Sequence, residues 1–163
     1  MLIAFLINFV RGSYQDELDK FFKAINRFDV AQRIVSKVTL AKAGMKLKFE
    51  AFVELSQHLV HYFDKNFESI TWHGFRLLAI DGSTTRPPDI KAIADHFVVW
   101  GVRKGKPSPM ARVSQLFDVL NKITVDALIY PKSSGECELA AQHLLKAMPD
   151  DLILLDRGYQ HGG

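Results

Sequence analysis

Residues 75–84 read Phe-Arg-Leu-Leu-Ala-Ile-Asp-Gly-Ser-Thr, and residues 152–159 read Leu-Ile-Leu-Leu-Asp-Arg-Gly-Tyr. Each stretch is a short apolar run that ends in an aspartate, Asp81 or Asp156, followed by glycine or by arginine and glycine. Short apolar runs bounded by turn-forming residues are typical of buried β-strands. We therefore expect two buried strands, each stopped by a turn at its aspartate.

The residues between these two runs predict further strands and one helix. Alternating or continuous apolar runs bounded by glycine, proline or asparagine indicate strands over residues 96–102, 111–119 and 123–130, with a turn at Asn121 and Lys122. Apolar residues spaced by three and four predict a helix over residues 136–148, which leads into the last strand. This part of the chain is therefore expected to form a mixed sheet with a helix.

The residues before this sheet have the periodicity of helices. Ser13 followed by Asp16 predicts a helix N-terminus, and apolar residues then recur every three or four positions up to Phe28. Two more helices are predicted, within residues 30–44 and over residues 46–63. Helices followed by strands, and then a helix before a last strand, predict an α/β protein with a helical domain over 1–70 and a mixed sheet over 71–163.

The composition is that of a soluble globular protein. Of 163 residues, 48% are hydrophobic and 24% charged, and 21 basic against 18 acidic residues give a net charge of +3. This composition excludes collagen-like, disulfide-rich and disordered classes. The single cysteine, Cys137, closes no intramolecular disulfide, which favours the cytoplasm. The apolar run from Leu2 to Val10 is shorter than the roughly 20 residues of a membrane-spanning helix and lacks signal-peptide features, so we expect a buried helix and no membrane association.

The two aspartates are the candidates for chemistry. Ligands gather beyond the carboxyl ends of strands in open α/β sheets, and carboxylates held there bind hard divalent cations. A pair of bound metal ions activates the attacking oxygen and stabilises the leaving oxygen in phosphoryl transfer. For either aspartate alone, a turn role is the better interpretation, because aspartate favours turns. Their occurrence after two similar strands favours Asp81 and Asp156 as metal ligands.

Four segments together resemble the DDE transposases of the insertion-sequence-four family. They are residues 77–84, residues 108–114, Glu136 with residues 139–144, and residues 150–159. The resemblance extends over about residues 12–159. It implies an RNase-H-like sheet, with Asp81 and Asp156 as the first and second catalytic aspartates and as ligands of Mg²⁺ or Mn²⁺. It further implies metal-dependent DNA cleavage and strand transfer, with the element ends and the target DNA as partners.

The chain departs from this family at its C-terminus. The family's third carboxylate is a glutamate on a later helix, in a Tyr, Arg, Glu, Lys signature, and the chain stops seven positions after Asp156. We therefore expect a truncated transposase with a partial catalytic domain that does not itself catalyse strand transfer. Glu136 and Glu138 lie before the last strand, and nothing in the sequence places them at the metal site.

Basic residues are candidate DNA contacts under this resemblance. Those nearest the predicted sheet are Arg103, Lys104, Lys106, Arg112 and Arg157. Phosphate contacts by such residues give affinity that salt weakens, whereas a solvated surface is the usual place of a lysine. A second hypothesis is a noncatalytic DNA-binding or oligomerising fragment, which would associate with itself or with an intact transposase and interfere with it.

Overall fold

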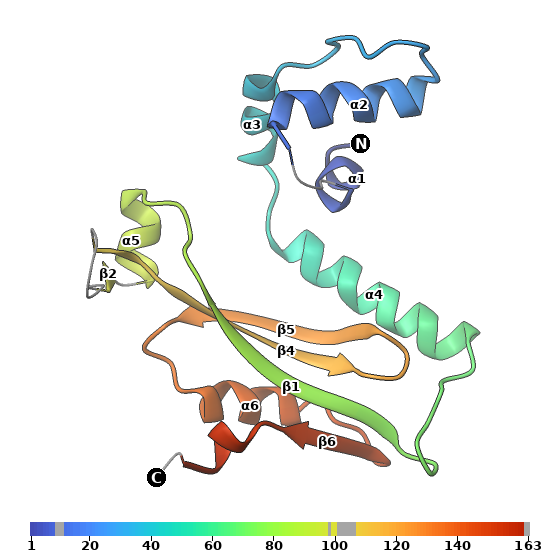
Figure 1. Ribbon diagram of the computed structural model, residues 1–163, viewed down its shortest axis with the longest axis vertical. Coiled ribbons are helices and arrows are strands. Elements are labelled where there is room, and N and C mark those ends of the chain that lie inside the picture. The colour runs from blue at the N-terminus through green and yellow to red at the C-terminus, as the bar shows by residue number, and fades with distance from the viewer. Residues whose placement is uncertain (9–11, 98, 101–106, 162–163) are drawn as a thin grey trace. The chain divides into compact units, whose positions relative to one another are not determined.

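The structure is a computed structural model of residues 1–163, and it describes all of them except 9–11, 98, 101–106 and 162–163 (Figure 1). The chain divides into two compact units, Met1–Val53 and Glu54–Gly163. The predicted division of the chain at residue 70 falls within the second unit and stays a prediction. Among the described residues, no helix is long and apolar enough to cross a membrane.

The first unit consists of three helices around a small apolar core. They are α1 (Leu2–Ile7), α2 (Tyr14–Asn26) and α3 (Lys37–Gly44). The Ser13 side chain accepts a hydrogen bond from the backbone N–H of Asp16, as the sequence predicted. Phe5, Leu18 and Leu40, one from each helix, form the buried core. The helix predicted within residues 30–44 is confined to its second half.

Four strands of the second unit form a mixed sheet in the order β5-β4-β1-β6. They are β1 (Arg76–Thr85), β4 (Ala111–Asp118), β5 (Ile123–Pro131) and β6 (Asp151–Leu155). β1, β4 and β5 pair antiparallel, whereas β6 pairs parallel with β1. Parallel neighbours need a crossover connection, and α6 (Glu136–Leu144) lies in the connection between β5 and β6 (Figure 1). The predicted mixed α/β class is confirmed.

A second, two-stranded sheet and two further helices also belong to the described elements. α4 (Glu50–Asn66) precedes β1, and its start confirms only part of the helix predicted over 46–63. α5 (Lys91–Phe97) is followed by β2 (Val99–Trp100), which pairs antiparallel with β3 (Ser108–Pro109). His96 and Phe97 are therefore helical, and the strand predicted over 96–102 was wrong for them. Residues 98, 101 and 102 of that strand lie outside the described residues.

The predicted turn at Asp81 was also wrong. β1 continues through Asp81 to Thr85, and it pairs with β4 as far as Thr85 opposite Ala111. Asp-Gly favours a turn locally, but Thr84 and Thr85 are β-branched and suit a strand. The ladder with β4 outweighs the local preference, so Asp81 lies inside a strand rather than at its end.

One face of the four-stranded sheet carries the core of the second unit. Leu78 and Ile80 of β1, Leu116 of β4 and Ala140 of α6 form a buried cluster. His143 of α6 is fully buried and bridges two strands, with Nδ1 2.9 Å from Oδ2 of Asp126 and Nε2 3.0 Å from Oγ of Ser114. A carboxylate only accepts hydrogen bonds, so Nδ1–H donates to Asp126. The polar contacts fasten α6 to β4 and β5.

Asp118 forms a buried ion pair at the far end of β4. Nε of Arg76 donates to Oδ2 of Asp118 at 2.7 Å, and the backbone N–H of Asn121 donates to Oδ1 at 3.0 Å. Burial favours the neutral carboxyl, but the hydrogen bonds from Asn121 and Arg76 outweigh it and hold the pKa of Asp118 below its ordinary value. The turn predicted at Asn121 and Lys122 is confirmed, with Lys122 at a φ of 61°.

We expect Asp118→Asn to destabilise the fold by about 3 kcal/mol, because it leaves the Arg76 charge without its buried partner. The folded pKa of Asp118 lies below its unfolded value, so the stabilisation is present above the unfolded pKa and is lost as the pH falls through the folded pKa. Urea unfolding between pH 7 and pH 3 measures both effects. Equal acid sensitivity of the wild type and Asp118→Asn would contradict this assignment.

We expect His143→Ala to cost about 3 kcal/mol of unfolding free energy, because it leaves a cavity and removes the partner of Ser114 and Asp126. His58→Ala is the matched control, since His58 is an exposed histidine on α4. Thermal or urea unfolding of the two variants compares them. A loss below about 0.5 kcal/mol for His143→Ala, the range of ordinary surface changes, would show that the network is dispensable.

Candidate functional site

Parallel pairing of β1 and β6 brings Asp81 and Asp156 to neighbouring positions. The last pair of this ladder is Ile80 opposite Leu155, and each aspartate is the next residue along its own chain segment. Paired strands lie about 4.8 Å apart. The structure therefore places the two predicted aspartates at one rim, where β6 ends and β1 continues beside β4.

The two carboxylates have the same local hydrogen bond. Oδ1 of Asp81 accepts from the backbone N–H of Gly82 at 2.8 Å, and Oδ1 of Asp156 accepts from the backbone N–H of Arg157 at 2.5 Å. Both residues are exposed. Within the described residues, Oδ2 of neither aspartate has a hydrogen-bond or ion-pair partner. Each side chain is thus oriented through one oxygen and presents the other.

Such a pair of carboxylates fits Mg²⁺ or Mn²⁺. Mg²⁺ keeps several waters and is commonly bound through one or two carboxylates together with substrate phosphates. The described part of the chain contains no group of three or more His, Cys, Asp or Glu side chains arranged to hold a metal ion. The parallel register brings two carboxylates to this rim, and among the described residues neither Glu136 nor Glu138 forms a group of three with them.

Glu136 instead forms an ion pair. Its Oε1 lies 3.0 Å from Nη1 of Arg112, which is a half-buried residue of β4. The pair joins the first residue of α6 to β4 beside the position where β4 faces Thr84. Arg112 was predicted as a DNA contact, but part of its charge is compensated by Glu136 in this structure.

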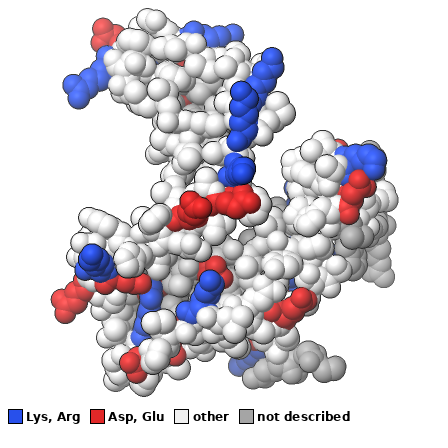
Figure 2. All heavy atoms as spheres, turned by 180° about the vertical axis from the view of Figure 1, so that it is seen from behind, with Lys and Arg blue, Asp and Glu red and all other residues white. Residues whose placement is uncertain are grey.

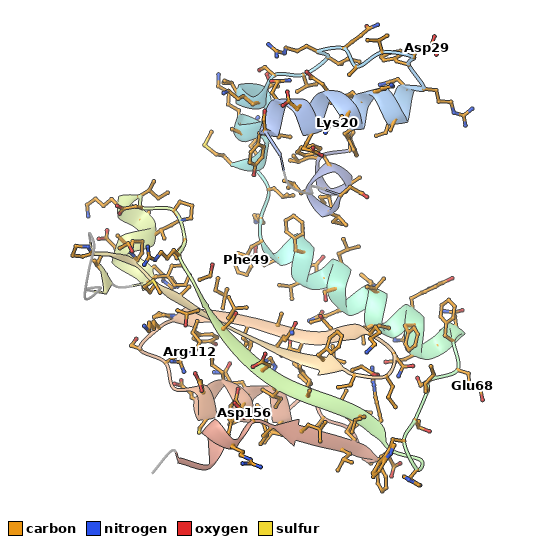
Figure 3. The ribbon with its side chains drawn as sticks, viewed as in Figure 1. Lys20, Asp29, Phe49, Glu68, Arg112 and Asp156 are labelled. Carbon is orange, nitrogen blue, oxygen red and sulfur yellow. The ribbon has the colours of Figure 1, made fainter. Side chains whose placement is uncertain are left out.

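Of the other predicted DNA contacts, one lies within the described residues and three lie outside them. Arg157 is exposed and begins the short 3-10 helix η1 (Arg157–His161), directly after Asp156, which is labelled in Figure 3. Arg103, Lys104 and Lys106 lie outside the described residues. On the face seen in Figure 2, basic and acidic side chains are interspersed.

Tyr159 is a residue of this site that the sequence reasoning missed. Its half-buried ring packs against the cluster of Leu78, Ile80, Leu116 and Ala140. Burial, followed by the negative charges of Glu136 and Asp81, raises the pKa of the Tyr159 hydroxyl above its ordinary value. The only signal in the sequence was an aromatic residue three positions after Asp156, which by itself does not distinguish a surface ring from a packed one.

The chain is similar to a transposase. No family model matches it, and no solved structure matches it. It is 29% identical over 86 residues to the Escherichia coli (strain K12) protein named "Putative transposase InsZ", a match that covers 52% of this chain and 28% of that protein. The chain thus spans less than a third of the relative that it matches. This similarity supports a relationship to transposases.

Proposed function

We propose that this chain carries part of the catalytic centre of a DNA transposase of the DDE type, in which Asp81 and Asp156 bind Mg²⁺ or Mn²⁺. The observation that carries this proposal is the parallel register of β1 and β6, because it brings two separated aspartates to one rim. The similarity to the Escherichia coli protein supports the class of reaction. DNA is the partner that this class of reaction requires.

The strand arrangement supports an RNase-H-like fold for the second unit. Three strands consecutive in the large sheet, β1, β4 and β5, pair antiparallel, and β6 adds in parallel beside β1 after a helix. β1 therefore has neighbours on both sides and holds Asp81 on a rigid support. Sites on strands position side chains more accurately than sites on loops.

The two aspartates are oriented by different backbone amides, and in this proposal they bind the same cation. The backbone amides of Gly82 and Arg157 orient one oxygen of each carboxylate, which leaves the second oxygens to bind the cation. A bound divalent cation supplies a nucleophile at neutral pH and stabilises charge on the leaving oxygen of the DNA backbone. We propose that Arg157, which directly follows Asp156 and is exposed, contacts a phosphate of the bound DNA.

Asp81→Asn and Asp156→Asn should each lower the affinity for Mn²⁺ at least tenfold, because each change removes a charged ligand. An asparagine Oδ1 still accepts from the backbone amide that each aspartate uses, so the local backbone is preserved. Mn²⁺ titrations followed by electron paramagnetic resonance measure the affinity. Asp95→Asn is the control, since Asp95 is an exposed aspartate of α5 that pairs with Lys91.

Wild-type affinity in both rim variants would overturn the metal site. Loss of affinity in Asp95→Asn as well would show nonspecific binding to acidic side chains, and it would also count against the proposal. The expected pattern is loss of affinity in the two rim variants alone.

Arg157→Ala should weaken DNA binding and reduce the slope of log K against log salt concentration by about 0.9, the value for one phosphate contact on duplex DNA. Lys91→Ala removes an equal charge from α5 and is the control. Gel-shift titrations at several salt concentrations give both slopes. An unchanged slope for Arg157→Ala would contradict the phosphate contact. DNA binding without any binding of Mn²⁺ would favour the noncatalytic DNA-binding function instead.

A further inference from the structure

The backbone of Tyr159 closes the turn that follows Asp156. Its N–H donates to the carbonyl oxygen of Asp156 at 3.1 Å. Its own carbonyl oxygen lies 3.7 Å from Sγ of Cys137, which donates from the first turn of α6. The turn that carries Asp156 is therefore tied to a helix that is itself fastened to β4 by the Arg112–Glu136 ion pair.

The side chain of Tyr159 extends from this turn to β1. The ring packs against the buried cluster that includes Leu78 and Ile80 of β1. A Cβ built on Gly82 would lie 3.8 Å from the Tyr159 hydroxyl oxygen, in ordinary van der Waals contact. The hydroxyl therefore lies against the residue whose amide holds Asp81. One side chain thus connects the turn of Asp156 to the strand of Asp81.

Tyr159 contacts β1 from the side away from the Asp81 carboxylate. Successive side chains of a strand point to opposite faces, so Gly82 shares the face of Ile80, which packs against α6, and Asp81 is on the other face. Tyr159 supports the strand without covering the carboxylate. A Cβ at Gly82 would meet the Tyr159 hydroxyl in ordinary contact, so only a larger side chain there would compete with the hydroxyl for space.

We propose that Tyr159 is a positioning residue, which holds the turn carrying Asp156 in register with the strand carrying Asp81 so that both carboxylates bind one divalent cation. The part of this inference that concerns the cation depends on the proposed function. The part that concerns positioning is a property of the chain alone and can be measured without a metal. Partners that orient metal ligands typically change metal affinity 10- to 100-fold when they are removed.

The first experiment measures positioning in the metal-free full chain. Hydrogen exchange of the Gly82 and Arg157 amides, which donate to the two carboxylates, is followed by NMR in the wild type, Tyr159→Ala, Tyr159→Phe and Val125→Ala. Val125 is the matched control, because it is half-buried against the same cluster but comes from β5. We expect at least tenfold faster exchange of both amides in Tyr159→Ala, and wild-type exchange in Tyr159→Phe and Val125→Ala.

Uniformly faster exchange across the sheet in both Tyr159→Ala and Val125→Ala would assign Tyr159 a merely structural role and overturn the inference. Unchanged exchange at Gly82 and Arg157 in Tyr159→Ala would also overturn it. Rescue by Tyr159→Phe would show that the packed ring, rather than the hydroxyl, maintains the register.

The second experiment adds Mn²⁺ to the same variants. We expect about tenfold weaker binding by Tyr159→Ala and wild-type binding by Tyr159→Phe and Val125→Ala. Gly82→Val should weaken binding as well, because the branches beyond its Cβ would enter the space of the Tyr159 hydroxyl. If the wild type does not bind Mn²⁺, the proposed metal site fails, whereas the exchange data still decide the positioning role. Equal Mn²⁺ affinity of Tyr159→Ala and the wild type would overturn the inference.

Discussion

The parallel ladder between β1 and β6 is the constraint on which the candidate site depends. It pairs Arg76 with Asp151 and ends with Ile80 opposite Leu155. Because side chains alternate along a strand, a slip of one residue would turn Asp81 toward α6 and remove Ile80 from the core. Burial of Leu78 and Ile80 therefore fixes the position of the aspartate as well as the stability of the strand. The site is aligned by the core beneath it.

The helix that makes this parallel pairing possible is held by polar as well as apolar contacts. Leu139 and Ala140 are buried, and His143 reaches Ser114 on β4 and Asp126 on β5. The Tyr130 hydroxyl also donates to Oε1 of Gln142, at 3.0 Å. Apolar packing alone permits a helix to slide along a sheet, whereas directed hydrogen bonds to two strands select one position. The hydrogen bond from Sγ of Cys137 to the carbonyl oxygen of Tyr159 connects this helix to the turn that carries Asp156. The position of the helix therefore also fixes the position of that turn.

Local sequence patterns predicted the long elements and failed where tertiary pairing decides. The apolar runs predicted the strands β4, β5 and β6. The Ser13 cap was also predictable, because its side chain accepts a hydrogen bond from the backbone N–H three residues later. The turn at Asp81 was wrong because a partner strand stabilises the extended backbone beyond it. His96 and Phe97 were expected in a strand, but they continue a helix in which Lys91 and Asp95 form an ion pair one turn apart.

The candidate site was predictable in part for the same reason. Two aspartates after apolar runs are visible in the sequence, and their adjacency requires that the two runs pair in parallel with Ile80 opposite Leu155. Tyr159 and His143 were not predictable as supports, because their partners Gly82, Ser114 and Asp126 are distant in the sequence. The ion pair between Arg112 and Glu136 was equally unpredictable from the sequence. The two residues are separated by 24 positions, and the fold brings α6 next to β4.

The ion pair between Arg112 and Glu136 affects the charge that DNA would encounter at the rim. Two exposed aspartates repel a DNA phosphate, and the nearest cation of β4 already has an acidic partner at 3.0 Å. Arg157 is exposed and has no ion-pair partner among the described residues. A divalent cation at Asp81 and Asp156 would neutralise their two charges and leave Arg157 as a net positive group beside them. In the proposed site, binding of the cation would thus come before tight binding of the DNA backbone, because the rim becomes attractive to phosphate only once its carboxylates are neutralised.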